Sequence, residues 1–166
     1  MKKYIDKIHV IFTIICLVLI LIGVVRLIFM YNNLPSQVGV HFAADGSFDV
    51  IVSKSKLLYI GYPYVVSLGI VLLFDFFIYI SSKIKLGLKV NKKGEDIVKS
   101  GFKLFVDIFK FSWVFFLSVI WSDCVIRQYY LNTNIPRIIM LIQFINIIIF
   151  IIFIIVIRNK YSLKKG

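Results

Sequence analysis

The chain is poor in the residues from which most catalytic and metal sites are built. It contains two histidines, two cysteines and eight acidic residues in 166 positions. Cys16 and Cys124 form no CxxC pair and are expected at different depths, so we predict neither a disulfide nor a zinc site from them. The sequence also lacks an HExxH motif, a phosphate-binding loop and a serine–histidine set. We therefore expect no enzyme, no catalytic residue and no cofactor.

Acidic residues are also few relative to basic ones, and the net charge is +12. A nucleic-acid-binding surface needs basic residues interleaved with aromatic ones, and the most basic segment of this chain has no such pattern. We therefore do not expect a nucleic-acid partner. An anionic lipid bilayer is a simpler partner for these charges.

Apolar residues are abundant, because 60% of the chain is hydrophobic. About 20 consecutive apolar residues are enough to span a bilayer as a helix, and four segments qualify: His9–Met30, Leu57–Ile80, Leu104–Ile126 and Arg137–Ile157. The first follows several lysines, as in a signal peptide, but it is too long and no cleavage site follows it. The sequence therefore predicts an all-α polytopic membrane protein, one four-helix domain over residues 1–166 with connecting loops 31–56 and 81–103.

The basic residues predict the orientation of this domain. Most of them fall at the two chain ends and in loop 81–103: Lys2, Lys3, Lys7, Lys83, Lys85, Lys89, Lys92, Lys93, Lys99, Lys103, Arg158, Lys160, Lys164 and Lys165. Cytoplasmic loops carry the excess of Lys and Arg. We therefore expect a multi-pass protein of a bacterial cytoplasmic membrane, with both termini cytoplasmic and loop 31–56 outside.

Loop 31–56 contains a strong signal for a β-hairpin. Apolar residues alternate with others in Val38–Phe42 and again in Phe48–Val52, and Asp45-Gly46 lies between them. Alternation on both sides of an Asp-Gly pair is typical of a hairpin. We therefore predict a short extracytoplasmic hairpin between the first two helices.

The apolar pattern also selects a register for the hairpin. A two-residue loop would place the apolar residues of the two strands on opposite faces, whereas a three-residue loop places all of them on one face. The three-residue loop pairs Phe42 with Phe48 and Val40 with Val50, and it requires Gly46 in the left-handed conformation.

The other face of the hairpin is polar, with His41 opposite Asp49 in this register. The hairpin is either a structural plug over the helix ends or a recognition element that meets a partner. We do not expect a metal there, because an EF-hand or a zinc site needs more ligands. The candidate recognition residues are His41, Phe42, Asp45, Gly46, Asp49 and Lys54.

The run LP–V–HF–G–D–SK in this segment is formed by Leu34, Pro35, Val38, His41, Phe42, Gly46, Asp49, Ser53 and Lys54. It resembles the domain of unknown function at the N-terminus of SdpI-type bacterial immunity membrane proteins, which place this motif after their first helix. The best-known type protects producer cells from a secreted peptide toxin and captures a repressor at the membrane. The resemblance implies a membrane module with a protective role. The sequence has no room for the second helical domain of these proteins, so repressor capture is not implied.

Polar side chains inside the predicted helices form two layers. Such residues at membrane depth are usually paired or functional. We predict that Asp75 meets Lys110 in the inner layer, and that Asp123 and Arg127 share a helix face near Arg26 in the outer layer. The complete set is Arg26, Asp75, Asp107, Lys110, Asp123, Arg127, Gln143 and Asn146.

Gln143 and Asn146 share one face of the last helix and should point into the bundle. We interpret the polar residues as packing pairs, because no continuous polar path for transport is visible in the sequence.

Two functions fit these observations. The first is an immunity or antimicrobial-peptide resistance protein that meets a peptide toxin at the outer hairpin. The alternative is an accessory subunit of a larger membrane complex, such as an ABC-type peptide or antibiotic exporter. Neighbouring genes for a toxin or for transporter subunits would separate these functions.

Overall fold

The computed structural model describes residues 2–84, 87 and 90–162 of the chain. It has the predicted architecture, in which long apolar helices carry a small two-stranded antiparallel hairpin between the first and second spans. The elements are α1 (Lys2–Met30), η1 (Tyr31–Asn33), β1 (Gln37–Phe42), β2 (Phe48–Ser53), α2 (Leu57–Ile60), α3 (Tyr62–Lys83), α4 (Lys92–Phe115), η2 (Phe116–Trp121), α5 (Ser122–Arg127) and α6 (Asn134–Tyr161).

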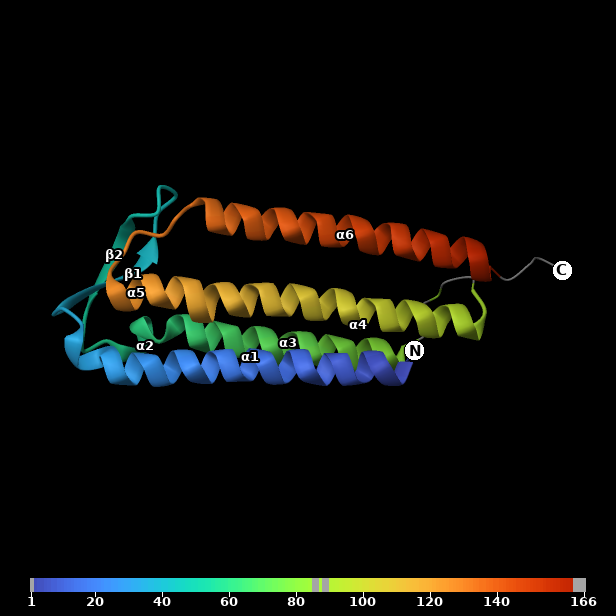
Figure 1. Ribbon diagram of the computed structural model, residues 1–166, viewed down its shortest axis with the longest axis horizontal. Coiled ribbons are helices and arrows are strands. Elements are labelled where there is room, and N and C mark those ends of the chain that lie inside the picture. The colour runs from blue at the N-terminus through green and yellow to red at the C-terminus, as the bar shows by residue number, and fades with distance from the viewer. Residues whose placement is uncertain (1, 85–86, 88–89, 163–166) are drawn as a thin grey trace.

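Four helical segments are long and apolar enough to cross a membrane, so the chain is a multi-pass membrane protein. The segments are Tyr4–Asn33, Tyr62–Lys83, Lys92–Arg127 and Asn134–Tyr161. They run side by side, with the hairpin over one end and the start of α1 and the end of α6 at the other (Figure 1). We call these the hairpin end and the terminal end. Helix α4 packs against α1, α3 and α6 and is the centre of the bundle.

The third helix begins earlier than predicted. The side chain of Asn91 caps it by accepting a hydrogen bond from the Gly94 amide at 2.9 Å. A Cβ at Gly94 would lie 2.7 Å from Cβ of Tyr161, so α4 and α6 approach closely here. This cap and contact explain why residues 92–103, predicted as loop, are helical. Lys85, Lys89, Lys164 and Lys165, which support the predicted orientation, lie outside the described residues.

The second span is broken near its start, where the sequence predicted a continuous helix. Helix α2 ends at Ile60, and α3 starts at Tyr62 after Gly61. Pro63 has no amide hydrogen to continue the helical hydrogen bonds of α2, which favours a new helix start at this point.

The predicted hairpin register is correct at the turn and at the far end of the strands, where Val38 pairs with Val52, and is wrong only around His41. Phe42 pairs with Phe48, and Gly46 has the predicted positive φ, 87°. Val40 does not pair with Val50, because β1 is irregular on both sides of His41 and His41 pairs with Val50 instead. As a result Val40 is buried, whereas Val50 is 43% exposed on the outer side.

The inner face of the hairpin is fixed to the helices at the hairpin end. The ring of Phe42 packs between Phe48 and Trp121, with centroid distances of 4.5 and 5.1 Å. Gln128 has a left-handed backbone, with φ 57°. Its Oε1 accepts the Gly39 amide at 2.8 Å. The hairpin is therefore held in one orientation on the bundle.

Candidate functional site

The outer face of the hairpin carries an exposed ion pair. Nδ1 of His41 lies 2.6 Å from Oδ1 of Asp49, and the two side chains are 55% and 43% exposed. The sequence predicted this juxtaposition. It stays even though the backbone pairs His41 with Val50, because Asp49 is the extra, unpaired residue between Val50 and Phe48 at the irregularity of the ladder.

Asp45 shapes the turn next to this pair. Its Oδ1 accepts the backbone amide of Ser47 at 2.9 Å and the Ser47 hydroxyl at 2.7 Å. These hydrogen bonds lower the pKa of Asp45 from its ordinary value of 3.8, because they favour the charged carboxylate.

The other predicted recognition residues have structural positions. Phe42 is buried against Trp121, and Gly46 is buried where its carbonyl accepts the Leu131 amide at 2.9 Å. Lys54 donates to the carbonyls of Asn32 and Leu34 at 2.9 and 3.1 Å. Of the predicted set, His41, Asp45 and Asp49 therefore form the accessible part. We call these three residues the hairpin face.

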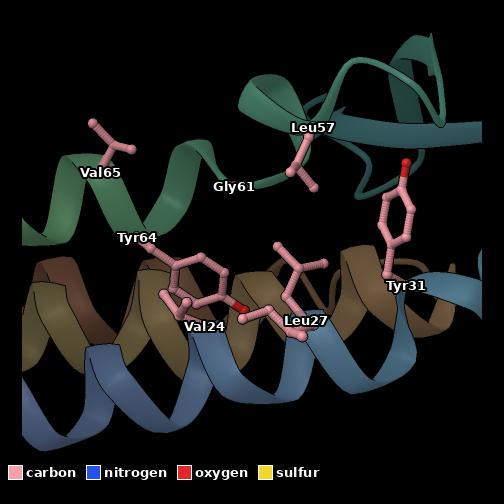
Figure 2. Close-up of a pocket in the computed structure, with 8 residues that line it drawn as sticks. Val24, Leu27, Tyr31, Leu57, Gly61, Tyr64 and Val65 are labelled. Atoms are coloured by element: carbon pink, nitrogen blue, oxygen red, sulfur yellow. The ribbon is translucent and has the colours of Figure 1, made fainter.

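An apolar groove opens beside the hairpin, between α1 and the α2–α3 break (Figure 2). Its volume is about 460 Å³. Figure 2 shows Tyr64 of α3 facing α1, with Gly61 at the break and Tyr31 near the hairpin. The groove is connected to the hairpin, because the Tyr31 hydroxyl donates to the Lys54 carbonyl at 3.2 Å. The lining residues are Val24, Leu27, Ile28, Tyr31, Leu57, Gly61, Tyr64 and Val65.

The predicted outer layer of charges also forms at the hairpin end. Asp123 accepts hydrogen bonds from both Arg26 and Arg127, the latter at 3.1 Å. The side chains are partly exposed, between 33% and 54%. This network joins α1 to α5 and serves as support for the hairpin end.

The predicted pair of Asp75 and Lys110 forms inside the bundle. The Lys110 ammonium lies 2.6 Å from Oδ1 of Asp75 and also contacts Oδ1 of Asp107 at 3.2 Å. It donates a second hydrogen bond to the Thr13 hydroxyl at 2.8 Å. The fully buried ammonium is thus held by two hydrogen bonds and by the nearby charge of Asp107.

His9 belongs to the same cluster, although the sequence placed it at the edge of the membrane. Its Nδ1 lies 2.8 Å from Oδ1 of Asp107. His9 and Thr13 are four residues apart in α1, as neighbours on one helix face are. That spacing was a usable signal for the missing partners of Asp107 and Lys110.

The two amide side chains of α6 are buried or half-buried, which agrees with their predicted place inside the bundle. Asn146 donates to the Phe105 carbonyl at 3.3 Å. Gln143 is buried, and neither of its amide atoms has a hydrogen-bond partner within residues 2–84, 87 and 90–162.

Comparison with family models, curated proteins and solved structures gives no match for this chain. The hairpin, the groove and the charged residues themselves are therefore the features that bear on function.

Proposed function

We propose that the chain is a bacterial immunity protein that protects the cell against a membrane-active peptide toxin. In this proposal the protein lies in the cytoplasmic membrane with both termini inside, and the hairpin end faces the outside. The sequence supports the orientation through its Lys and Arg distribution. The resemblance of Leu34–Lys54 to SdpI-type immunity proteins supports the role.

The observation that carries the proposal is the division of the hairpin into an anchored face and a free one. Phe42 and Gly39 fix the inner face to Trp121 and Gln128. The His41–Asp49 pair stays exposed, although the edge of the His41 ring also contacts Trp121, with the ring centroids 5.9 Å apart. An exposed ion pair contributes little to stability. A rigid support below a free polar pair is therefore better suited to binding than to holding the fold together.

The groove suits the apolar side of the same partner. Membrane-active peptides are amphipathic and lie at the membrane surface, with their apolar side chains toward the lipid. The groove reaches the hairpin through Tyr31 and Lys54, so one peptide can contact both. We infer that polar groups of the toxin meet the hairpin face and that its apolar side chains enter the groove.

The test measures protection in a sensitive bacterial host that expresses the chain. Cells are challenged with a panel of purified membrane-active peptides and with spent medium of the organism that encodes the chain. The wild type should raise the inhibitory concentration of at least one toxin several-fold. His41→Ala and Asp49→Ala should remove this protection at unchanged protein level, whereas Lys92→Ala, an exposed change at the terminal end, should keep it. Full protection by both hairpin variants would contradict the proposal.

Gly61 permits a separate test of the groove. A Cβ there has only an ordinary contact, 3.4 Å from the Leu57 carbonyl oxygen, so Gly61→Leu should fill the groove without disturbing the fold. Gly69 is the matched control, since a Cβ there meets nothing within 4 Å. Gly61→Leu should reduce protection and Gly69→Leu should not. Equal protection by both variants would remove the groove from the toxin site.

An accessory role in a larger membrane complex is favoured by α6. Only 11% of its most apolar window is buried, compared with 39% for the third span, and it packs against α4 at the edge of the bundle (Figure 1). Purification in mild detergent tests this role. A transporter subunit that co-purifies in fixed ratio, and is lost when exposed apolar side chains of α6 are changed to alanine, would favour it over immunity.

A further inference from the structure

The charged cluster inside the bundle has no part in the proposed recognition, and it joins three helices. His9 and Thr13 come from α1, Asp75 from α3, and Asp107 and Lys110 from α4. We propose that this cluster is a site for a divalent transition-metal ion of the zinc class. His9, Asp75 and Asp107 are the ligands, and the Lys110 ammonium competes with the ion for the two carboxylates.

The ligand atoms are close enough to surround one ion. One atom from each of His9, Asp75 and Asp107 lies within 4.8 Å of the other two. Zinc binds nitrogen and oxygen ligands at about 2.0–2.2 Å in a tetrahedron, which spaces ligand atoms roughly 3.3 Å apart. The imidazole of His9 favours a zinc-class ion over magnesium or calcium, which prefer oxygen ligands alone.

The charges of the cluster also favour a cation. Two carboxylates, those of Asp75 and Asp107, share the single ammonium of Lys110. Asp107 is fully buried, and its Oδ2 has no hydrogen-bond partner among the residues that the structure describes. A divalent ion that displaces the Lys110 ammonium would balance both carboxylates and supply the missing partner, which matters at membrane depth.

The side chains of the cluster differ in burial: those of His9 and Asp75 are 19% and 29% exposed on the surface of the bundle. Asp107 and Lys110 are fully buried behind them. The next charged pair toward the terminal end, Lys103 with Asp6, is satisfied by its own contact. A fully buried carboxylate whose Oδ2 has no hydrogen-bond partner among the described residues distinguishes this cluster from a simple salt bridge.

The experiment is a zinc titration of the full chain, purified in detergent without a histidine tag, read with a competing chromophoric chelator. The wild type should bind one Zn²⁺ per chain, and His9→Ala and Asp107→Asn should abolish binding. His41→Ala is the matched control and should bind normally, because it removes the other histidine, which also pairs with an aspartate. Lys110→Met should bind about tenfold or more tightly, because it removes a like charge a few ångströms from the ion.

Three outcomes of the zinc titration would overturn the proposal. They are wild-type binding no stronger than that of the His9 variant, loss of binding in His41→Ala, or weaker binding in Lys110→Met. If a variant does not accumulate, the wild type alone decides, since a ligand of the folded state raises the melting temperature. Zn²⁺ should raise the melting temperature of the wild type and Mg²⁺ should not. A wild type whose melting temperature does not respond to Zn²⁺ would contradict the site.

Discussion

The two histidines of the chain make the same contact in opposite surroundings. Nδ1 of His41 lies 2.6 Å from Asp49 on the hairpin, and Nδ1 of His9 lies 2.8 Å from Asp107 in the bundle. The hairpin pair is 55% and 43% exposed, whereas the bundle pair is 19% and 0% exposed. Solvent screens the first pair, and the low dielectric of the bundle makes the second sensitive to the loss of any partner.

The comparison shows which polar residues are free to evolve a binding role. Removing an exposed partner leaves its neighbour in water, whereas removing a buried one leaves an uncompensated charge. The hairpin pair can therefore change at little cost to the fold, which would let it adapt to a toxin in the proposed function. The bundle pair of His9 and Asp107 cannot change in this way, because Asp107 also pairs with the buried Lys110.

The largest expected effect comes from breaking the buried network at Lys110. Lys110→Met leaves Asp75 and Asp107 without their cation, and the loss of a buried partner costs about 3–5 kcal/mol. Asp75→Asn should cost less, because Lys110 keeps Asp107 as a counter-ion. The double change should be less harmful than Lys110→Met alone. Thermal unfolding in detergent is compared for the wild type, the two single variants and the double variant. Strictly additive losses of stability would show that the two residues do not interact.

The next effect concerns the anchor of the hairpin. A Cβ at Gly46 would lie 2.0 Å from the Leu131 carbonyl oxygen, at a φ of 87° that side chains rarely adopt. Gly46→Val should cost at least about 1–3 kcal/mol in backbone strain and lower the yield of folded protein. Size-exclusion chromatography measures this yield, with Gly69→Val as a control in open space. Equal yields of the two variants would mean that the turn does not need glycine.

The exposed pair should respond far less. His41→Ala should change the free energy of unfolding by no more than about 1 kcal/mol, as expected for a solvent-exposed ion pair. His9→Ala should destabilise the protein more, since it removes a partner of fully buried Asp107. The melting temperatures of the two variants test this difference. If His41→Ala lowered the melting temperature more than His9→Ala, the exposed pair would be the more important one for stability, contrary to the prediction.

The smallest effect is the pH response of the hairpin turn. The folded state lowers the pKa of Asp45, so its contribution to stability is present above the ordinary value of 3.8 and is lost as the pH falls through the folded value. Ser47→Ala removes the hydroxyl bond and should weaken this acid sensitivity. Melting curves of both proteins at neutral and strongly acidic pH check it. An identical acid response would exclude a role for this bond.

Local patterns in the sequence predicted the spans, the hairpin turn, the positive φ of Gly46 and the pairing of Asp75 with Lys110. These features depend on apolar length, strand alternation and helix depth, all of which are visible in one chain. The irregular register around His41 was not predictable. It arises where β1 fits against Gln128 and Trp121, which lie more than 80 residues away along the chain.

In the candidate site, too, local contacts were predictable from the sequence and contacts between distant segments were not. The contact of His41 with Asp49 follows from the hairpin pattern, but the burial of Phe42 and the anchoring of Lys54 depend on how the hairpin rests on the helices. The contact of His9 with Asp107 joins residues 98 positions apart. Its helix-face spacing is visible in the sequence, but the rotation of α1 against α4 is set only by packing.

The most direct test of an outward-facing recognition hairpin is labelling from one side of the membrane. Cys16 and Cys124 are replaced by serine, and a single cysteine is placed at exposed Ala44 in the turn or at exposed Lys92 at the start of α4. Intact cells are treated with a thiol reagent that does not cross the membrane. We predict that the cysteine at 44 reacts and that the one at 92 reacts only after the cells are opened. Labelling of position 92 but not position 44 in intact cells would place the hairpin inside and contradict the proposed toxin contact.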